Sequence, residues 1–249
     1  RVIRLNENGT IDTGFNIGTG FPNTIYSILY YSNDKIIIGG GYTSFNGISY
    51  TSTICLNNNG SVDKYFISDL GYSSAVYSII KTQDNDILVG GNFTTYGGSN
   101  ISNFIRLNSD GTLDETFKVG NSFNSTIRCI TLSGNSMFIG GNFTQYNKRL
   151  YNRYIKLDVN GKIDYTFDSE FGFNNMVYCS LIDNNKIIIG GNFTSYSGVT
   201  QNRIIRLNSD GTIDSSFIIG NGFNNILNNI QQYLNDKLLI CGSFTSYSG

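Results

Sequence analysis

The chain has 249 residues, of which 39% are hydrophobic and only 14% are charged, and its formal net charge at pH 7 is −1. This composition suffices for a folded core and offers no basic surface for nucleic acid or for an anionic membrane. No apolar run approaches the roughly 20 residues of a membrane span, and no secretory leader stands at the start. We therefore expect no nucleic-acid partner and no membrane insertion. Because the sequence starts at Arg1 without methionine, we expect a processed product or a segment of a longer chain.

One pattern fills the chain five times. The leucine of "RLN" and its variants recurs every 50 or 51 residues, at Leu5, Leu56, Leu107, Leu157 and Leu207. A period of this length in a sequence rich in β-formers is typical of propeller blades, which bury their sheet faces by stacking around a ring. The repeats predict an all-β fold: a five-bladed β-propeller of four-stranded antiparallel blades, forming a single domain over residues 1–249.

The predicted strands follow the same order along the chain. Residues 1–15 supply a third and a fourth strand, and complete repeats then follow. Alternation and β-branched residues mark the four strands of the fourth repeat, at 176–182, 186–194, 203–208 and 212–217. Residues 226–249 supply only a first and a second strand. We therefore expect the ring to be closed by N-terminal strands that pair with C-terminal strands, and no stretch shows a helical period.

The turn between the third and fourth strands is the clearest local signal. It reads "NENGT", "NNNGS", "NSDGT", "DVNGK" and "NSDGT", which suits a type I turn followed by a left-handed glycine in a bulge. This register places Leu5 opposite Ile11. It also predicts a structural ion pair in four of the five repeats: Arg4 with Asp12, Arg106 with Asp114, Lys156 with Asp164, and Arg206 with Asp214. In the remaining repeat, Cys55 stands opposite Asp63 and no such pair can form.

These motifs carry a family resemblance. The pattern "RLNSDGTIDSSF…GNGF…KIIIGGNFTSYSG" resembles the delta-60 repeat, a β-propeller-like repeat of bacterial surface proteins and of some viral and phage proteins. The resemblance covers the whole chain, because "LNxDGxxDxxF" and "GGxFTxY" recur together in nearly every repeat. It implies a repeat fold used for display or binding, without an established catalytic site.

Glycine pairs and acidic turns offer little chemistry. A phosphate loop leads into a helix and carries a lysine, whereas the "GG" pairs lie inside predicted strands, where glycine admits a bulge or a close-packed aromatic ring. In the turns, the position of the bidentate acid of an EF-hand falls on Phe167 or Phe217. We therefore expect no cofactor and no metal. Sequons at Asn92, Asn100, Asn142 and Asn192 are interpreted as coincidence in an Asn-rich chain.

The sequence contains no recognisable set of catalytic residues. The chain has no histidine, and its four cysteines, Cys55, Cys129, Cys179 and Cys241, lack metal-ligand spacing and are expected to be free thiols. Acids outside the repeat, such as Asp34, Asp84, Asp86, Asp183 and Asp236, fall in short turns. The sequence therefore predicts a protein that is not an enzyme, and a glycosidase-like enzyme with two facing carboxylates is the less favoured alternative.

Aromatic residues divide into two groups. Four positions are aromatic in every repeat, as at Phe15, Phe21, Tyr42 and Phe45, and are expected in the core. Others, among them Tyr50, Tyr151 and Tyr154, vary between repeats. Long connections should lie on one face and carry any binding site. The candidate binding residues on these connections are Tyr50, Asn100, Lys148, Arg149, Tyr151, Arg153, Gln201, Asn23, Asn124, Asn174 and Asn224.

The function that follows is a noncatalytic interaction or display module of a larger surface or virion-type structural assembly. Its partners would be other proteins of that assembly. The alternative is a lectin-like adhesin that binds a glycan through the long-loop face, for which Arg149 and Tyr151 supply cationic and aromatic chemistry. Localisation is not fixed by the sequence, and an extracellular surface or a virion is favoured.

Overall fold

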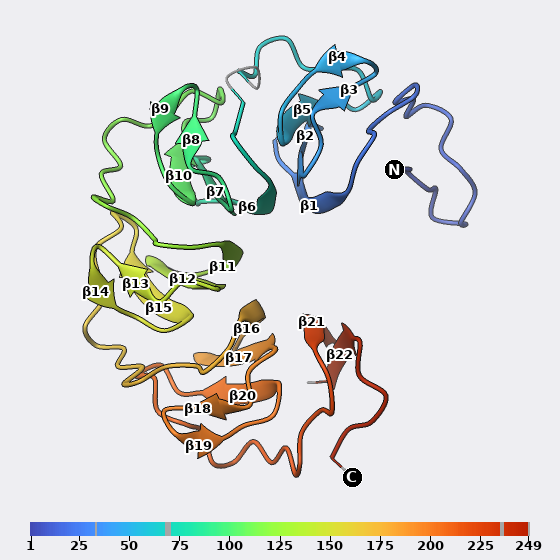
Figure 1. Ribbon diagram of the computed structural model, residues 1–249. Helices are drawn as coiled ribbons and strands as arrows, with labels where there is room; N and C mark the ends of the chain where they lie inside the picture. Colours follow the sequence, from blue (N-terminus) through green and yellow to red (C-terminus); the bar gives the residue numbers. More distant parts are fainter. Residues whose placement is uncertain (33, 68–70, 235–236, 249) are drawn as a thin grey trace. The chain divides into compact units, whose positions relative to one another are not determined.

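The computed structural model describes residues 1–32, 34–67, 71–234 and 237–248 (Figure 1). These residues form antiparallel sheets joined by turns, and no helix occurs among them, so the all-β prediction is confirmed. The contacts of the chain divide it into two compact units, Arg1–Thr116 and Phe117–Gly249. The same sheet of three antiparallel strands is repeated in both units. Asp236, expected in a short turn, and Gly249, at the end of the last predicted strand, lie outside the described residues.

The first unit contains two complete repeats. In each, the second strand lies in the middle of the sheet, between the first and the third. The first repeat consists of β1 (Ile25–Tyr30), β2 (Ile36–Gly40) and β5 (Thr53–Leu56), with the short hairpin β3 (Ser44–Phe45) and β4 (Ile48–Ser49). The second consists of β6 (Val76–Lys81), β7 (Ile87–Gly91) and β10 (Phe104–Leu107), with β8 (Thr95–Tyr96) and β9 (Ser99–Asn100).

The second unit contains two complete repeats and a partial one. The third repeat consists of β11 (Ile127–Ser133), β12 (Ser136–Gly141) and β15 (Tyr154–Asp158), with β13 (Gln145–Tyr146) and β14 (Arg149–Leu150). The fourth consists of β16 (Val177–Asp183), β17 (Lys186–Gly191) and β20 (Ile204–Leu207), with β18 (Ser195–Tyr196) and β19 (Val199–Thr200). The partial repeat has β21 (Leu227–Tyr233) and β22 (Lys237–Gly242).

The predicted fourth strand is shorter than expected. It is reduced to one bridged residue per repeat, as in Leu207 with Ile213 and Leu5 with Ile11. The aspartate that follows ends the strand, because its carboxylate accepts the backbone N–H two residues later, as Asp214 does from Ser216 at 3.1 Å. Each complete repeat therefore has three strands and a bridged edge, while the turn before that edge matches the prediction, with Gly211 at φ 93°.

The connection from the second to the third strand is more regular than expected, because it folds into a two-residue hairpin. Asn46 and Gly47 occupy left-handed conformations at φ 51° and 79°, as a type I′ turn requires. The connection that enters each repeat packs on this hairpin, and Phe123 bridges to Tyr146 in the third repeat. The two long connections of a repeat therefore lie at the same end of its sheet.

The second glycine of each "GG" pair faces a β-bulge in the first strand. The register shifts between Ile25 and Ser27 in β1, and at the equivalent place in β6, β11, β16 and β21. A β-carbon on Gly40 would lie 2.4 Å from the carbonyl oxygen of Thr24. A side chain at this position would therefore displace the bulge, which explains the glycine as the sequence suggested.

The first glycine of the pair receives the next repeat. A β-carbon on Gly39 would lie 2.9 Å from Cγ1 of Val76, and one on Gly190 would lie 2.4 Å from Cδ2 of Leu227. Val76 and Leu227 both begin the first strand of the following repeat. These neighbours of the first glycine are aliphatic, and this glycine sets how closely successive sheets pack. The expected aromatic ring lies beside the second glycine, since a β-carbon on Gly40 would also lie 2.9 Å from Cδ1 of Tyr42.

The core lies between successive sheets and beneath the hairpins. The four aromatic positions of the repeat are buried in the first four repeats, apart from the half-buried Phe217, as predicted. Their rings meet at short range, with 4.6 Å between the centroids of Phe21 and Tyr42. In the partial fifth repeat the rings of Phe223 and Phe244 pack together, while Tyr247 is exposed.

Residues 1–15 pack against the first repeat. This packing is the same as that between the third-strand region of one complete repeat and the repeat that follows it. The amide of Asn16 donates to the carbonyl of Asn59 at 3.0 Å, and Asp168 makes the equivalent bond to Asp210 at 2.9 Å. Pairing between residues 1–15 and β22 is not shown by the structure, so closure of the ring stays a prediction.

Replacing Gly40 by alanine tests the role of the second glycine. We expect Gly40→Ala to lower the free energy of unfolding by about 2 kcal/mol or more, because the added carbon collides with a backbone carbonyl. The neighbouring Gly41→Ala is the control, since its β-carbon would meet only ordinary contacts, the nearest at 3.5 Å. Urea denaturation of both variants measures the difference, and equal stabilities would contradict this role.

Candidate functional site

The repeated aspartates are held in ion pairs at the edge of each sheet. Arg4 Nε lies 2.6 Å from Asp12 Oδ2, and Arg106 Nε lies 2.6 Å from Asp114 Oδ2. Lys156 Nζ lies 2.8 Å from Asp164 Oδ2, and Arg206 Nε lies 2.7 Å from Asp214 Oδ2. The other oxygen of each carboxylate accepts from the following turn. These carboxylates therefore serve the fold.

In one repeat the aspartate has no basic residue opposite it on the third strand and pairs with a lysine from another part of the sheet instead. Cys55 leaves Asp63 without an arginine across the sheet, and Lys35, from the turn between β1 and β2, forms an ion pair with Asp63 instead. Lys186, the first residue of β17, occupies the equivalent position in the fourth repeat and pairs with Asp214 at 2.7 Å. The signal in the sequence is the constant separation of 28 residues between lysine and aspartate.

Three of the candidate asparagines fix the connections between repeats. Oδ1 of Asn124 accepts from the amide of Thr144 at 2.9 Å, and its Nδ2 donates to the hydroxyl of Thr144 at 2.9 Å. Asn174 and Asn224 repeat this arrangement with Thr194 and Thr245. Their hydrogen bonds are thus used within the fold. Asn23 is exposed and stands one residue beyond this position in its repeat.

Arg153 serves its own repeat in the same way. It precedes the third strand in a left-handed conformation, and its Nη1 donates to the carbonyls of Asn142 and Phe143 at 3.2 and 3.4 Å. Arg203 makes the equivalent bonds in the fourth repeat. Burial lowers the pKa of Arg153. Its guanidinium is therefore largely committed to the backbone, and Tyr154 beside it is fully buried.

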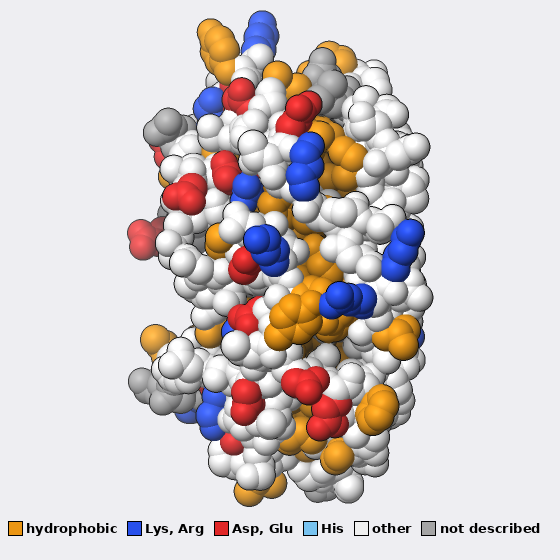
Figure 2. Space-filling model, turned by 90° about the vertical axis from the view of Figure 1, so that its left-hand side faces the viewer, with side chains coloured by type: hydrophobic (Ala, Val, Ile, Leu, Met, Phe, Trp, Pro, Cys, Tyr) orange, Lys and Arg blue, Asp and Glu red, His pale blue; other side chains and the backbone are white. Residues whose placement is uncertain are grey.

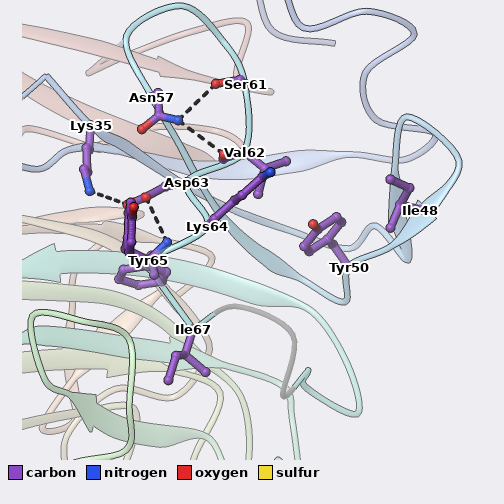
Figure 3. A pocket seen from close by; sticks show the side chains of 11 residues that line it. Lys35, Ile48, Tyr50, Asn57, Ser61, Val62, Asp63, Lys64, Tyr65 and Ile67 are labelled. Atoms are coloured by element: carbon purple, nitrogen blue, oxygen red, sulfur yellow. Dashed lines mark hydrogen bonds and ion pairs between the residues drawn. The ribbon is translucent and has the colours of Figure 1, made fainter.

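The remaining candidates lie on or just after the hairpins of separate repeats. Asn100 is exposed on β9, and Gln201 is half-buried after β19. Tyr50, after β4, lines a cavity of about 890 Å³ together with Ile48, Lys64 and Tyr65 (Figure 3). Lys35 and Asp63 lie at the opposite end of this cavity from Ile48. The structure thus leaves these three candidates on three different hairpins.

The third repeat brings several candidates together with residues that the sequence did not single out. Arg149 on β14 donates a hydrogen bond to the hydroxyl of Tyr165, and Asn152 Nδ2 donates to the carbonyl of Phe171 at 2.8 Å. Burial raises the pKa of Tyr151, and the nearby Tyr165 adds to the rise. We call this set the outer cluster: Arg149, Leu150, Tyr151, Tyr165 and Phe171.

The outer cluster is apolar and open to solvent. Leu150, Tyr165 and Phe171 are each at least 69% exposed. Lys148 stands beside the cluster in the hairpin turn, at φ 64°. Figure 2 shows a face of the protein on which hydrophobic side chains gather beside Lys and Arg side chains. In the fourth repeat the equivalent positions carry Thr200, Ser215 and Asn221, so that repeat lacks the cluster.

Two of the thiols are weakly acidic because they lie in desolvated surroundings. Burial raises the pKa of Cys55 and of Cys129 to about 12, which disfavours the thiolate. Over the described ranges, no three His, Cys, Asp or Glu side chains gather as a metal site. Within the same ranges, no helix has the length and apolar character needed to cross a membrane.

Comparison with known proteins places the repeats among propeller sequences. Residues 1–15, 32–66, 82–117 and 183–217 match a family described as a domain of unknown function (DUF5122) beta-propeller. DUF5122 beta-propeller repeats thus extend over much of the chain. No curated protein matches the sequence.

Two solved structures are similar at low identity. The computationally designed Ika8 protein has 12% identity, covering 87% of this chain and 80% of its own, with a TM-score of 0.45. The extracellular domain of the putative hybrid two-component system BT3049 from B. thetaiotaomicron has 15% identity and a TM-score of 0.23. That match covers 96% of this chain and 36% of the other.

Acid titration tests the ion pairs. The hydrogen bond from Lys156, followed by that from Thr166, lowers the pKa of Asp164 to about 2. A folded-state pKa below the unfolded value of 3.8 gives stability that is present above about pH 4 and lost as the pH falls toward 2. We expect Asp164→Asn to lose about 0.5–1 kcal/mol at pH 7 and to depend less on pH in this window.

Thermal denaturation at several pH values between 2 and 7 measures this dependence. Asp84→Asn is the control, because Asp84 is an exposed turn residue. A wild-type protein and an Asp164→Asn variant with parallel pH profiles would show that the pair does not stabilise the fold.

Proposed function

We propose that the chain is a noncatalytic interaction module, which binds a protein of a larger assembly through the outer cluster. The observation that carries this proposal is the exposure of Leu150, Tyr165 and Phe171 beside Arg149. Contiguous exposed apolar side chains are costly in water and mark interaction surfaces. Tyrosine and arginine are the residue types that dominate binding energy at protein interfaces.

The state of the carboxylates supports a noncatalytic role. A glycosidase needs one acid with a raised pKa and a second carboxylate facing it. The repeated aspartates have basic and turn partners, and the pKa of Asp214 is lowered by hydrogen bonds from Lys186, Ser216 and Arg206. Such groups stay ionised and occupied, which makes them poor proton donors.

The ring supplies the scaffold for this surface. We infer that residues 1–15 form the outer strands of the fifth blade against β22, so that a delta-60-type propeller of five blades closes on itself. The resemblance of all five repeats to one pattern supports this arrangement, as does the docking of residues 1–15 on the first repeat.

Exposed apolar residues at both ends of the chain favour the same closure. Leu5 is 55% exposed, whereas its equivalent Leu207 is 0% exposed. On β22, Leu239 is 56% exposed, whereas its equivalent Ile188 is 1% exposed. In complete repeats, these positions are covered by the neighbouring strand or sheet. Pairing β22 with residues 1–15 would cover the same positions in the fifth blade.

The family resemblance also supports the setting of the module. Delta-60 repeats occur in surface, viral and phage proteins, which favours an extracellular surface or a virion. A lectin-like use of the outer cluster is the second candidate, because Arg149 bonds the hydroxyl of Tyr165 and its charge acts on the nearby Tyr151. A glycan array with an Arg149→Ala, Tyr151→Ala double variant separates the two, since a protein-binding surface gives no selective sugar signal.

Site-specific photo-crosslinking in the intact assembly tests the protein partner. A benzoylphenylalanine placed at Tyr165 is expected to form a protein adduct, because this side chain lies within the outer cluster. The same probe at Ser215, the equivalent position of the fourth repeat, is the matched control and should give little adduct. Absence of an adduct at position 165, or equal yields at both positions, would contradict the proposal.

A further inference from the structure

The first repeat departs from the others around Asp63. In the other complete repeats, the second residue after the aspartate is a threonine or a serine whose hydroxyl donates to the carboxylate, as Thr116 does to Asp114 at 2.6 Å. Tyr65 stands at this position in the first repeat. Its backbone N–H still bonds Asp63 at 3.1 Å, but its side chain is 87% exposed. The first repeat thus gives up a hydrogen bond of the fold and displays an aromatic ring, and such departures from a local rule are expected where a residue serves a function.

This ring lines the cavity of about 890 Å³ shown in Figure 3. The cavity lies within the first unit, and its volume falls in the range of small-molecule sites, roughly 300–1,000 Å³. The rings of Tyr50 and Tyr65 line it together with the aliphatic side chains of Ile48, Val62 and Ile67. The cavity therefore offers a ligand both aromatic and aliphatic surface.

The amide and the aliphatic hydroxyl of the cavity are used within the fold. Asn57 Nδ2 donates to the hydroxyl oxygen of Ser61 at 3.0 Å and to the carbonyl of Val62 at 3.2 Å. The hydroxyl of Ser61 in turn donates to Oδ1 of Asn59 at 2.7 Å. Because each hydroxyl of a bound glycan that stays unpaired costs free energy, this arrangement favours a ligand with few polar groups.

The charges that line the cavity leave one cation over. The carboxylate of Asp63 is compensated by its ion pair with Lys35. Within the residues that the structure describes, neither the ammonium group of Lys64 nor the hydroxyl of Tyr50 has a hydrogen-bond or ion-pair partner. In Figure 3, Tyr50 lies between Lys64 and Ile48. Charge complementarity therefore favours a ligand that brings an anion to Lys64 and an apolar body to the rings.

The second repeat lacks these features. At the positions of the two tyrosines and of Lys64 it carries Ile101, Thr116 and Glu115. Both rings are absent there, and the charge has the opposite sign. The second repeat nevertheless forms the same hairpin and the same bridged turn. The fold therefore does not dictate which side chains line the cavity.

We propose that this cavity binds a small carboxylic acid with an apolar body, in its ionised form. The ammonium group of Lys64 forms an ion pair with the carboxylate, and the hydroxyl of Tyr50 donates a second bond to it. The rings of Tyr50 and Tyr65 pack against the apolar body. The site belongs to the first unit and shares no residue with the outer cluster, so it goes beyond the proposed protein interface.

Calorimetric titration of the full chain with hydrocinnamate tests the proposal, and hydrocinnamamide is the matched neutral probe. The wild type should bind the acid at least about fivefold more tightly than the amide, and Lys64→Gln should abolish that preference. Glu115→Lys is the control, because it places a cation at the equivalent position of the second repeat without the rings. This variant should bind both probes as the wild type does.

Tyr65→Thr separates binding from stability. It restores the hydroxyl that bonds the aspartate in the other complete repeats, so its melting temperature should equal or exceed that of the wild type. Its binding of both probes should weaken by about tenfold, because the exposed ring is lost. A purely structural role for Tyr65 predicts the reverse, a lower melting temperature with unchanged binding.

Three results would overturn the proposal. They are no binding of hydrocinnamate or of decanoate at millimolar concentration, equal binding of acid and amide, or unchanged binding by Lys64→Gln. A melting curve for each variant establishes that it is folded, and Lys64→Gln with Glu115→Lys carries the test if Tyr65→Thr unfolds. Because the outer cluster consists of other residues, failure here leaves the proposed protein interface untouched.

Discussion

Each complete sheet of this protein depends on the absence of a side chain at two adjacent positions, whereas the partial fifth repeat carries Cys241 at the first of them. The second glycine of each "GG" pair lets a carbonyl of the first strand approach, which creates the bulge. The first glycine lets the next repeat pack closely through an aliphatic residue such as Val76 or Leu227. One dipeptide therefore sets both the shape of a sheet and its contact with the next, which explains why the chain repeats it.

Much of the fold follows from this repetition in the sequence. The left-handed glycine of the third turn, the register of Leu5 with Ile11 and the aromatic core all agree with the pattern. The short length of the fourth strand could not be predicted from the sequence. A β-forming pattern does not reveal that the carboxylate of the following aspartate accepts a backbone N–H of the next turn. Local hydrogen bonding by the side chain overrides strand propensity there.

The candidate site was harder to predict, because its contacts join positions far apart in a repeat. Asn124 and Arg153 have residue types suited to ligands, yet the fold uses their hydrogen bonds for a threonine and for backbone carbonyls. Conversely, Tyr165 and Phe171 joined the outer cluster from a different connection.

The residues that the repeat needs differ from those that each repeat displays. Ion pairs, pinned asparagines and buried rings recur and stabilise the sheets, while the hairpins and the bulges present side chains that differ between repeats. The outer cluster stands out on these grounds. It uses a rigid scaffold to hold variable residues, as binding surfaces commonly do.

The central claim is that five repeats close into one ring, and a single cysteine tests it. In the fourth repeat Gly190 faces Ile204, so in a closed ring Cys241 would face Val2. Neighbouring antiparallel strands place such residues within disulfide distance. Mild oxidation of Val2→Cys, followed by mass analysis, should give a disulfide to Cys241 within one chain, while the control Ile3→Cys should not. A free Cys241, or a link only between two chains, would contradict closure.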